Sequence, residues 1–165
     1  MPGHADGDLR RADRRDRAAL EAAVATGTPY GGWCPKGGWA EDLPQPPGVL
    51  ALYPNLRETP SREPEQRTDW NVRDSSALLV LVRQGGLAVS EGTRRAVRHA
   101  GALERSVAIV DVDDPEAARQ VLAFLAPFAG DPVCIAGPRE SEAPGLEATA
   151  RRVLESVLTE IAARC

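Results

Sequence analysis

Three almost wholly apolar runs form the strongest hydrophobic pattern in the chain. They are ALLVLV at 77–82, SVAIVDV at 106–112 and PVCIAG at 132–137. Continuous runs of this length, without alternation of apolar and polar residues, are typical of strands buried on both faces of a parallel sheet. We therefore predict three buried parallel strands, and we expect VLALY at 49–53 to form a further short strand.

The segments around these runs have the spacing of amphipathic helices. We predict helices over 13–26, 63–76, 93–104, 115–128 and 141–164. In the last of them the apolar residues form one stripe, made of Leu146, Val153, Leu154, Val157, Leu158 and Ile161. Strands that alternate with helices predict right-handed βαβ units, so we expect an α/β fold with a mostly parallel sheet flanked by helices on both faces.

The length of 165 residues is that of one ordinary domain, and 42% hydrophobic residues suffice for a core. We assign residues 13–165 to a single domain and expect residues 1–12 to be a disordered or degenerate terminus.

Charge and cysteine content exclude several classes of protein. The net charge of −4 provides no positive field for nucleic acid or an anionic membrane. No apolar run is long enough to cross a membrane, and the first residues lack the apolar segment of a secretory signal. Three widely spaced cysteines predict neither a disulfide framework nor a metal site. A reduced, cytoplasmic setting agrees with this composition.

Ligands of parallel α/β sheets bind beyond the carboxyl ends of the strands, which directs attention to the loop after residue 82. In GGLAVSEGT, Gly86 and Gly92 allow a ligand to approach the backbone, and Ser90 and Thr93 offer hydroxyls. Amides at the following helix start would favour an anion. The loop matches neither the P-loop nor the GxGxxG pattern, and the alternative is an ordinary strand-to-helix turn.

The same rule selects GPRES at 137–141, which follows the last predicted strand. Arg139 in this segment can hold a phosphate or carboxylate through two parallel hydrogen bonds. The alternative is a surface arginine paired with Glu140 or Glu142.

RTDWNVRDS at 67–75 crowds polar groups onto one predicted helix. Arg67, Asn71 and Asp74 share a helical face, and Asp69 and Arg73 have the spacing of an ion pair. These residues are candidates for ligand contact. The alternative is a solvated helix with Trp70 in the core.

The glycine- and proline-rich stretch at 31–47 has neither helical nor strand periodicity. Trp33 and Trp39 can stack on a planar ring, or they can pack the loop onto the domain. Lys36 can lower the pKa of nearby Cys34, but no histidine stands in an evident relation to this thiol, so we do not predict a nucleophile.

These strings together resemble a known family. GTPYGGWCPKG, AED at 40–42, QRTDWNVRDSS and AGPRESEAPG are similar to the putative molybdenum carrier family, a branch of the Rossmann-like SLOG group related to lysine-decarboxylase-like phosphoribohydrolases. The resemblance implies a single Rossmann-like domain, a crevice formed by these loops and commonly a homo-oligomer. Its name implies molybdenum cofactor as a ligand, and the wider group implies a nucleotide-like ligand.

The resemblance and the residues together give one set of predicted ligand-binding residues. The set consists of Lys36, Arg67, Asn71, Arg73, Asp74, Gly86, Ser90, Gly92, Thr93, Arg139 and Ser141. We assign no catalytic residue and no metal ligand.

Three features depart from the family pattern. The region before Arg17 lacks the family's GGQTGxD loop and, as we interpret it, the strand that precedes this loop. Glu91 replaces a glycine, and its carboxylate would repel a phosphate if it pointed into the site. Ala96 stands where the phosphoribohydrolases carry a glutamate, which argues against hydrolysis by their mechanism.

Three functions therefore remain open. The first is a binding protein for a phosphorylated or nucleotide-like ligand, including molybdenum cofactor. The second is a hydrolase of nucleotide N-glycosidic or phosphate bonds, for which Asp69, Asp74, Glu91 and Asp113 are the local acid or base candidates. The third is a degenerate family member that acts as an interaction protein.

Overall fold

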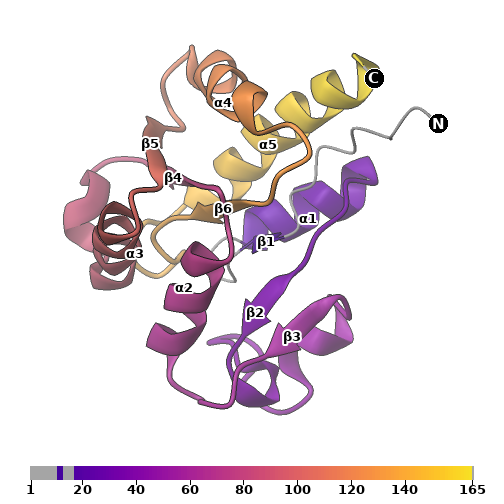
Figure 1. Ribbon diagram of the computed structural model, residues 1–165, viewed down its shortest axis with the longest axis vertical. Helices are drawn as coiled ribbons and strands as arrows, with labels where there is room; N and C mark the ends of the chain where they lie inside the picture. The colour runs from indigo at the N-terminus through magenta and orange to yellow at the C-terminus, as the bar shows by residue number, and fades with distance from the viewer. Residues whose placement is uncertain (1–10, 13–16, 165) are drawn as a thin grey trace.

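The computed structural model describes residues 11–12 and 17–164, which form a four-stranded sheet, a two-stranded sheet and five α-helices (Figure 1). The strands are β1 (Arg11–Ala12), β2 (Gly32–Cys34), β3 (Leu56–Glu58), β4 (Ala77–Val82), β5 (Ser106–Asp111) and β6 (Val133–Ala136). The α-helices are α1 (Arg17–Thr26), α2 (Pro64–Arg73), α3 (Glu91–Ala102), α4 (Ala117–Leu125) and α5 (Leu146–Ala163). These elements confirm the predicted α/β class and its five helices.

The main sheet is parallel throughout and has the strand order β1-β6-β4-β5. Ala77 at the start of β4 lies opposite Ser106 on one side and Val133 on the other. Helices α1, α4 and α5 cover one face of this sheet, while α2 and α3 cover the other (Figure 1). The predicted arrangement with helices on both faces is therefore confirmed.

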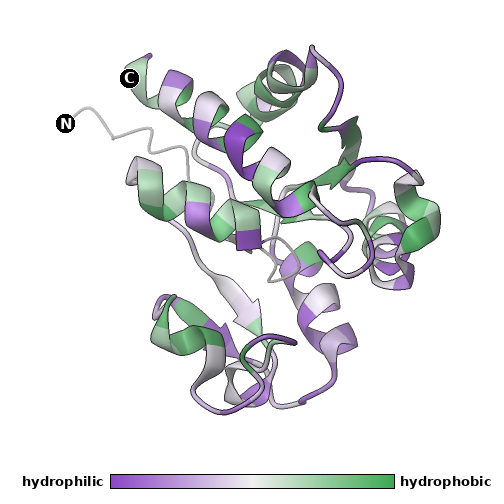
Figure 2. Cartoon of the chain, turned by 180° about the vertical axis from the view of Figure 1, so that it is seen from behind, coloured by the Kyte–Doolittle hydropathy of each residue, from purple (hydrophilic) through white to green (hydrophobic). Residues whose placement is uncertain are grey.

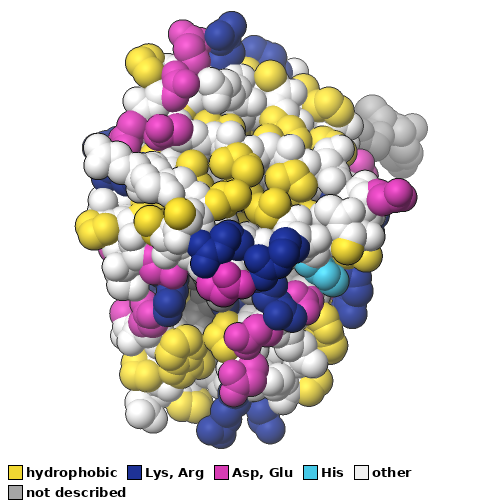
Figure 3. Space-filling view, turned by 90° about the vertical axis from the view of Figure 1, so that its left-hand side faces the viewer, with side chains coloured by type: hydrophobic (Ala, Val, Ile, Leu, Met, Phe, Trp, Pro, Cys, Tyr) yellow, Lys and Arg dark blue, Asp and Glu magenta, His cyan; other side chains and the backbone are white. Residues whose placement is uncertain are grey.

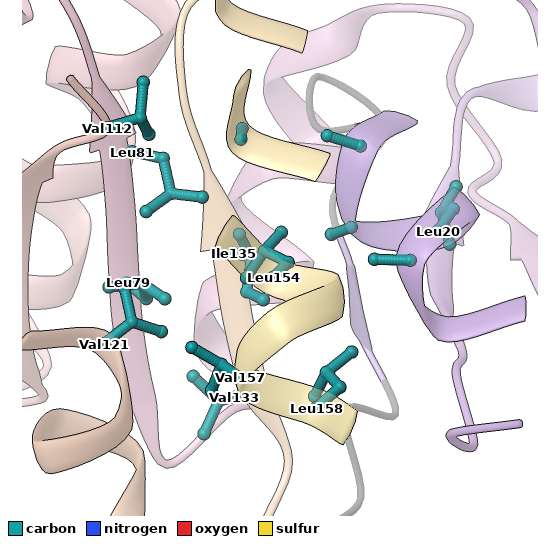
Figure 4. Close-up of a cluster of buried hydrophobic side chains, with 14 of the residues drawn as sticks. Leu20, Leu79, Leu81, Val112, Val121, Val133, Ile135, Leu154, Val157 and Leu158 are labelled. Carbon is teal, nitrogen blue, oxygen red and sulfur yellow. The ribbon is translucent and has the colours of Figure 1, made fainter. Parts of the chain in front are cut away.

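Strand β4 lies at the centre of the core and is buried along all six residues. Leu79 and Leu81 face α4 and α5, where they meet Val121 and Leu154 (Figure 4). Leu78 and Val80 point to the opposite face and join the cluster beneath α2 and α3. Figure 2 shows the matching pattern on the helices, where hydrophobic and hydrophilic residues alternate around each coil. The continuous apolar run is thus explained by helices on both sides.

Strand β5 differs from its prediction. We expected it to be buried, but Ile109 is 48% exposed and only Val110 among its residues is fully buried. Within the described part of the chain β5 pairs only with β4 and is an edge strand. Figure 3 looks at this side of the molecule and shows hydrophobic side chains gathered above a group of charged ones.

The segment 49–53 was also predicted wrongly, since Gly48–Ala51 forms a 3₁₀ turn rather than a strand. Its apolar residues anchor a loop: Val49 and Tyr53 are buried in the same cluster as Leu20 of α1. The loop joins β2 to β3, which pair in parallel as a separate small sheet. The apolar residues at 49–53 therefore pack this loop beside α1.

The two ends of the chain hold further differences. The strand before α1, which we expected to be missing, is present, since Arg11–Ala12 pairs in parallel with β6. Most of the terminus predicted over 1–12, and the predicted helix start at 13–16, lie outside the described residues. Helix α5 begins at Leu146 rather than at residue 141, because Gly145 before it adopts a left-handed φ of 84°. No described helix is both long and apolar enough to span a membrane.

Candidate functional site

A pocket of about 290 Å³ lies beside the loop that follows β6 and supplies Arg139 and Glu140 to its wall. It is lined by Arg17, Trp39, Ala40, Glu41, Asp42, Arg67, Arg139, Glu140 and Glu147. We call it the crevice pocket. Its lining comes from the start of α1, the loop after β2, helix α2, the loop after β6 and the start of α5, so segments distant in sequence meet at the position that parallel sheets use for ligands.

Three arginines converge on this pocket from separate elements, and we call them the arginine triad. Arg17 opens α1, Arg67 lies on the inward face of α2, and Arg139 follows β6 by three residues. Arg67 is only 4% exposed, and its Nε donates to the Pro64 carbonyl over 3.3 Å. A guanidinium remains protonated in proteins, so Arg67 places a fixed positive charge in the pocket wall.

Two carboxylates from the loop after β2 pair with the triad. Asp42 accepts hydrogen bonds from both terminal nitrogens of Arg17, with 2.8 Å between Arg17 Nη2 and Asp42 Oδ1. Glu41 forms an ion pair with Arg139 and accepts a bond from the Ser141 hydroxyl over 3.3 Å. Two of the three arginines, Arg17 and Arg139, therefore already pair with carboxylates within the chain.

The pKa values of two glutamates near the pocket are shifted in opposite directions. Burial works against the charge of Glu142, but hydrogen bonds from the Arg139 amide and side chain and from Ser90 outweigh it and lower the pKa. Burial raises the pKa of Glu147, and the nearby charge of Glu21 raises it further. The arginine side of the pocket thus stabilises a carboxylate, while the α5 side disfavours one.

Of the predicted residues, Arg67 and Arg139 line the crevice pocket, and Ser141 touches its rim through Glu41. The predicted set omitted Arg17, Trp39, Glu41, Asp42, Glu140 and Glu147. A signal for some of these existed, because the AED string at 40–42 was part of the family resemblance.

Lys36 belongs to a second cavity of about 770 Å³, which we call the side pocket. Its lining includes Trp39, Glu58, Arg62 and three prolines. Trp39 lines both pockets and is 37% exposed. The predicted cation therefore lines a different pocket from the arginine triad.

The predicted residues at the end of α2 hold the small sheet in place. Asn71 accepts from the Trp33 amide over 2.9 Å and donates to the Trp33 carbonyl over 3.1 Å. Asp74 accepts from the Trp33 indole over 2.8 Å, and the Trp33 and Trp70 rings meet edge to face. Asn71 and Asp74 thus position β2, and neither lines one of the two pockets.

The predicted ion pair between Asp69 and Arg73 is wrong. Asp69 instead binds Arg95 of α3, with oxygen-to-nitrogen distances of 3.0 and 2.7 Å. Arg73 pairs with the adjacent Asp74 and lies over the Trp70 ring. The polar face of α2 therefore joins α3 and the small sheet.

Polar groups of the glycine loop after β4 cap the start of helix α3. The Ser90 hydroxyl accepts from the Thr93 amide over 3.2 Å and contacts the Thr93 hydroxyl at 2.9 Å, and both residues are 1% exposed. Gly86 adopts a φ of 55° that favours glycine, and Gly92 lies in the first turn of α3. This geometry agrees with the simpler alternative, a strand-to-helix turn with an N-cap.

Two of the departures from the family pattern, Glu91 and Ala96, lie on helix α3. Glu91 pairs with Arg94 and Arg98 on the surface of α3, with a side chain that is 67% exposed. It does not line the crevice pocket. Ala96 lies on α3 and is buried in the cluster that this helix forms with α2 and the sheet. Over residues 17–164, no group of three His, Cys, Asp or Glu side chains is arranged to hold a metal ion.

Comparison with known proteins identifies relatives of this arrangement. The model of the Circularly permutated YpsA SLOG family matches residues 14–158. The chain is also similar to the crystal structure of a Putative molybdenum carrier protein from Syntrophus aciditrophicus SB at 1.45 Å resolution. The two chains share 25% sequence identity and a TM-score of 0.75, over 93% of this chain and 96% of that one. No curated protein matches the chain. The resemblance drawn from the sequence is thus confirmed.

Proposed function

The chain belongs to the Circularly permutated YpsA SLOG family, and from this premise we propose that its crevice pocket binds a small ligand through a phosphate or similar oxyanion. The observation that carries the proposal is the convergence of Arg17, Arg67 and Arg139 on one pocket at the ends of parallel strands. The planar fork of a guanidinium matches the oxygens of such a group, and three forks from separate elements can surround it.

The size and surroundings of the pocket support a ligand larger than the oxyanion alone. About 290 Å³ is at the small end of ligand cavities, while the side pocket adds about 770 Å³ beyond Trp39. We propose that the anionic group lies at the arginine triad and that a planar ring lies against Trp39. A nucleotide has both parts, and stacking on an indole accepts any base.

A molybdenum cofactor is a further ligand of this class, which the name of the similar crystal structure brings forward. The described residues that line the crevice pocket include no cysteine or histidine. Arginines would therefore hold such a ligand by its oxyanion rather than by bonds from protein sulfur or imidazole to the metal. We propose that Arg17 and Arg139, which both line the pocket, do so.

We propose binding without turnover, because the candidate acids and bases are engaged elsewhere. Asp69 binds Arg95, Glu91 binds Arg94 and Arg98, and Asp113 accepts from Arg83 over 2.9 Å. Asp74 accepts from the Trp33 indole. None of these four predicted carboxylates lines the crevice pocket, which argues against a hydrolase that would use them there. The carboxylates that do line it are Glu41, Asp42, Glu140 and Glu147.

The function is tested by thermal unfolding with phosphate, AMP, ADP-ribose, molybdate, tungstate and a molybdopterin preparation. A ligand at about 100 times its dissociation constant adds about 2.7 kcal/mol of stability, which raises Tm by several degrees. Arg139→Ala should weaken the binding at least about tenfold, because a charged hydrogen bond contributes about 1.5–3 kcal/mol. The same mixtures should release no adenine or ribose phosphate.

Arg119→Ala is the matched control, because Arg119 also pairs with a glutamate but lies on α4 with a 78% exposed side chain. It should leave the ligand effect unchanged. A flat response to every compound would contradict the proposal and favour the degenerate interaction protein. Release of a base would favour the hydrolase instead.

We also propose that copies of the chain associate through the exposed β5 edge and that the protein acts in the cytoplasm. The edge position of β5 and the exposure of Ile109 support the first proposal. The second is supported by Cys34 and Cys134, which are buried as thiols, the form that a reducing compartment maintains.

A further inference from the structure

We propose that Glu41 and Asp42 form a displaceable internal counter-ligand of the arginine triad, which an incoming oxyanion must replace. The proposal rests on the proposed function, because it assigns the control of that same pocket. It makes Glu41 and Asp42 specificity-determining residues, since they set how strong an anion must be to enter.

The first support is the reach of these two adjacent side chains. Asp42 bridges to Arg17 at the start of α1, 25 residues earlier in the chain. Glu41 bridges to Arg139 after β6, 98 residues later. Consecutive residues of one loop thus bind two arginines that come from the start of α1 and from the segment after β6.

The second support is the geometry of the contacts. Both carboxylate oxygens of Asp42 accept from Arg17, which is the two-bond arrangement that a phosphate oxygen pair would also adopt. One guanidinium edge cannot present the same N–H groups to both acceptors at once. An oxyanion at Arg17 and Arg139 therefore competes directly with Asp42 and Glu41.

The third support is the charge of the pocket. Three guanidiniums face four carboxylates among its lining residues, Glu41, Asp42, Glu140 and Glu147. With all of them ionised, the acids outnumber the arginines and oppose the entry of a dianion. Without Glu41 and Asp42, the three arginines outnumber the two remaining acids, and the local field favours an anion.

The fourth support is that the contacts are exposed while their backbone is well formed. The side chains of Asp42 and Glu41 are 57% and 46% exposed, so their ion pairs contribute little net free energy and can be exchanged. Ala40 and Leu43 exchange two backbone hydrogen bonds of 3.1 Å each, so both acids lie at the tip of one tight turn. The turn can release both arginines in a single movement.

The test is the double variant Glu41→Gln/Asp42→Asn, which keeps side-chain shape and removes both charges. Titration calorimetry with inorganic phosphate, AMP and molybdate should show about 2- to 30-fold tighter binding than the original chain, the range expected for two exposed ion pairs. Each single variant should give part of this gain. The two single variants replace the double variant in the test if the double variant does not fold.

The matched control is Glu116→Gln/Glu155→Gln, which removes two negative charges that pair with Arg119 on α4 and Arg151 on α5. This variant should bind the probes as the original chain does. An equal gain in the control would overturn the proposal in favour of a general charge effect. Unchanged or weaker binding by the pocket variant would also overturn it.

The two proposals fail in distinguishable ways. If the original chain binds a probe and the pocket variant binds it no more tightly, the counter-ligand is refuted and the proposed function stands. If the original chain, the single variants and the double variant all bind none of the probes, the proposed function and the counter-ligand both fail. Binding by the variant alone supports the counter-ligand in its strongest form.

Discussion

At the scale of single residues, ionisation of two glutamates beside the crevice pocket affects the stability of the folded chain in opposite directions. Glu142 has a lowered pKa, because bonds from Arg139 and Ser90 outweigh its burial. Glu147 has a raised pKa, because of its burial and the charge of Glu21. The ionised form of Glu142 therefore stabilises the folded chain, whereas the ionised form of Glu147 opposes folding.

This difference predicts opposite pH dependence for two matched variants. Because its folded pKa is lowered, Glu142 contributes stability above its unfolded pKa, and this is lost as pH falls through the folded value. Glu142→Gln should therefore lower the free energy of unfolding at pH 7, by roughly 0.5–1.5 kcal/mol, with a smaller effect near pH 4. Urea denaturation at a series of pH values measures the difference.

Glu147→Gln should behave in the reverse manner. Because its folded pKa is raised, Glu147 contributes stability to the folded chain below its unfolded pKa. This stability is lost as pH rises through the folded pKa. The variant should be more stable than the original chain at pH 7, with a difference that narrows on acidification. Effects of the same sign in both variants would show that the two environments are not opposed.

At the scale of elements, the loop between β2 and β3 is held by a close approach of two glycines. A Cβ at Gly48 would lie 2.0 Å from the carbonyl oxygen of Gly38, and Gly48 has a φ of 55°. Both the contact and the dihedral angle exclude a larger residue without movement of the backbone. The turn with Glu41 and Asp42 lies between these two glycines in the chain.

Gly48→Ala should therefore destabilise the fold by about 2–4 kcal/mol, because dihedral strain and a backbone clash add together. Gly130→Ala is the control, since Gly130 has a similar left-handed φ of 85° but nothing within 4 Å of a Cβ. It should cost only about 1 kcal/mol. Chemical denaturation of both variants gives the comparison, and equal losses would show that the contact with Gly38 is unimportant.

An element was predictable from sequence where packing against its neighbours requires a particular pattern of residues. β4 was predictable because burial on both faces requires a continuous apolar run. The run of β5 has a similar composition, but the sequence does not show that β5 pairs with a strand on one side only among the described strands. The apolar residues at 49–53 likewise do not reveal that they anchor a loop instead of pairing in a sheet.

The same reasoning explains which residues of the crevice pocket the sequence singled out. Arg139 was predictable because it follows a buried strand, and Arg67 because it shares a helix face with Asn71. Glu41 and Asp42 lie on an irregular loop, where no periodicity marks a side chain as inward or outward. Their partners are 98 and 25 residues away, so only the folded chain brings the pairs together.

At the scale of the whole molecule, the main sheet is protected unequally at its sides. β4 and β6 are each paired on both sides, whereas β5 pairs only with β4 among the described strands. Its six residues, SVAIVD, include neither proline nor lysine, which are common devices that prevent pairing at an edge. A second copy offers the same edge, and antiparallel pairing about a two-fold axis would join two sheets into one.

Ile109→Lys tests this association, since it places a charge at the most exposed apolar position of β5. Light scattering after size exclusion should give the mass of a dimer for the original chain and that of a monomer for the variant, with unchanged circular dichroism. Leu52→Lys is the control, because Leu52 is an apolar side chain with 56% exposure on the loop before β3. It should remain dimeric. Association through β5 would be refuted if the original chain were monomeric or if both variants dissociated. The β5 edge would then be exposed to solvent without a partner copy.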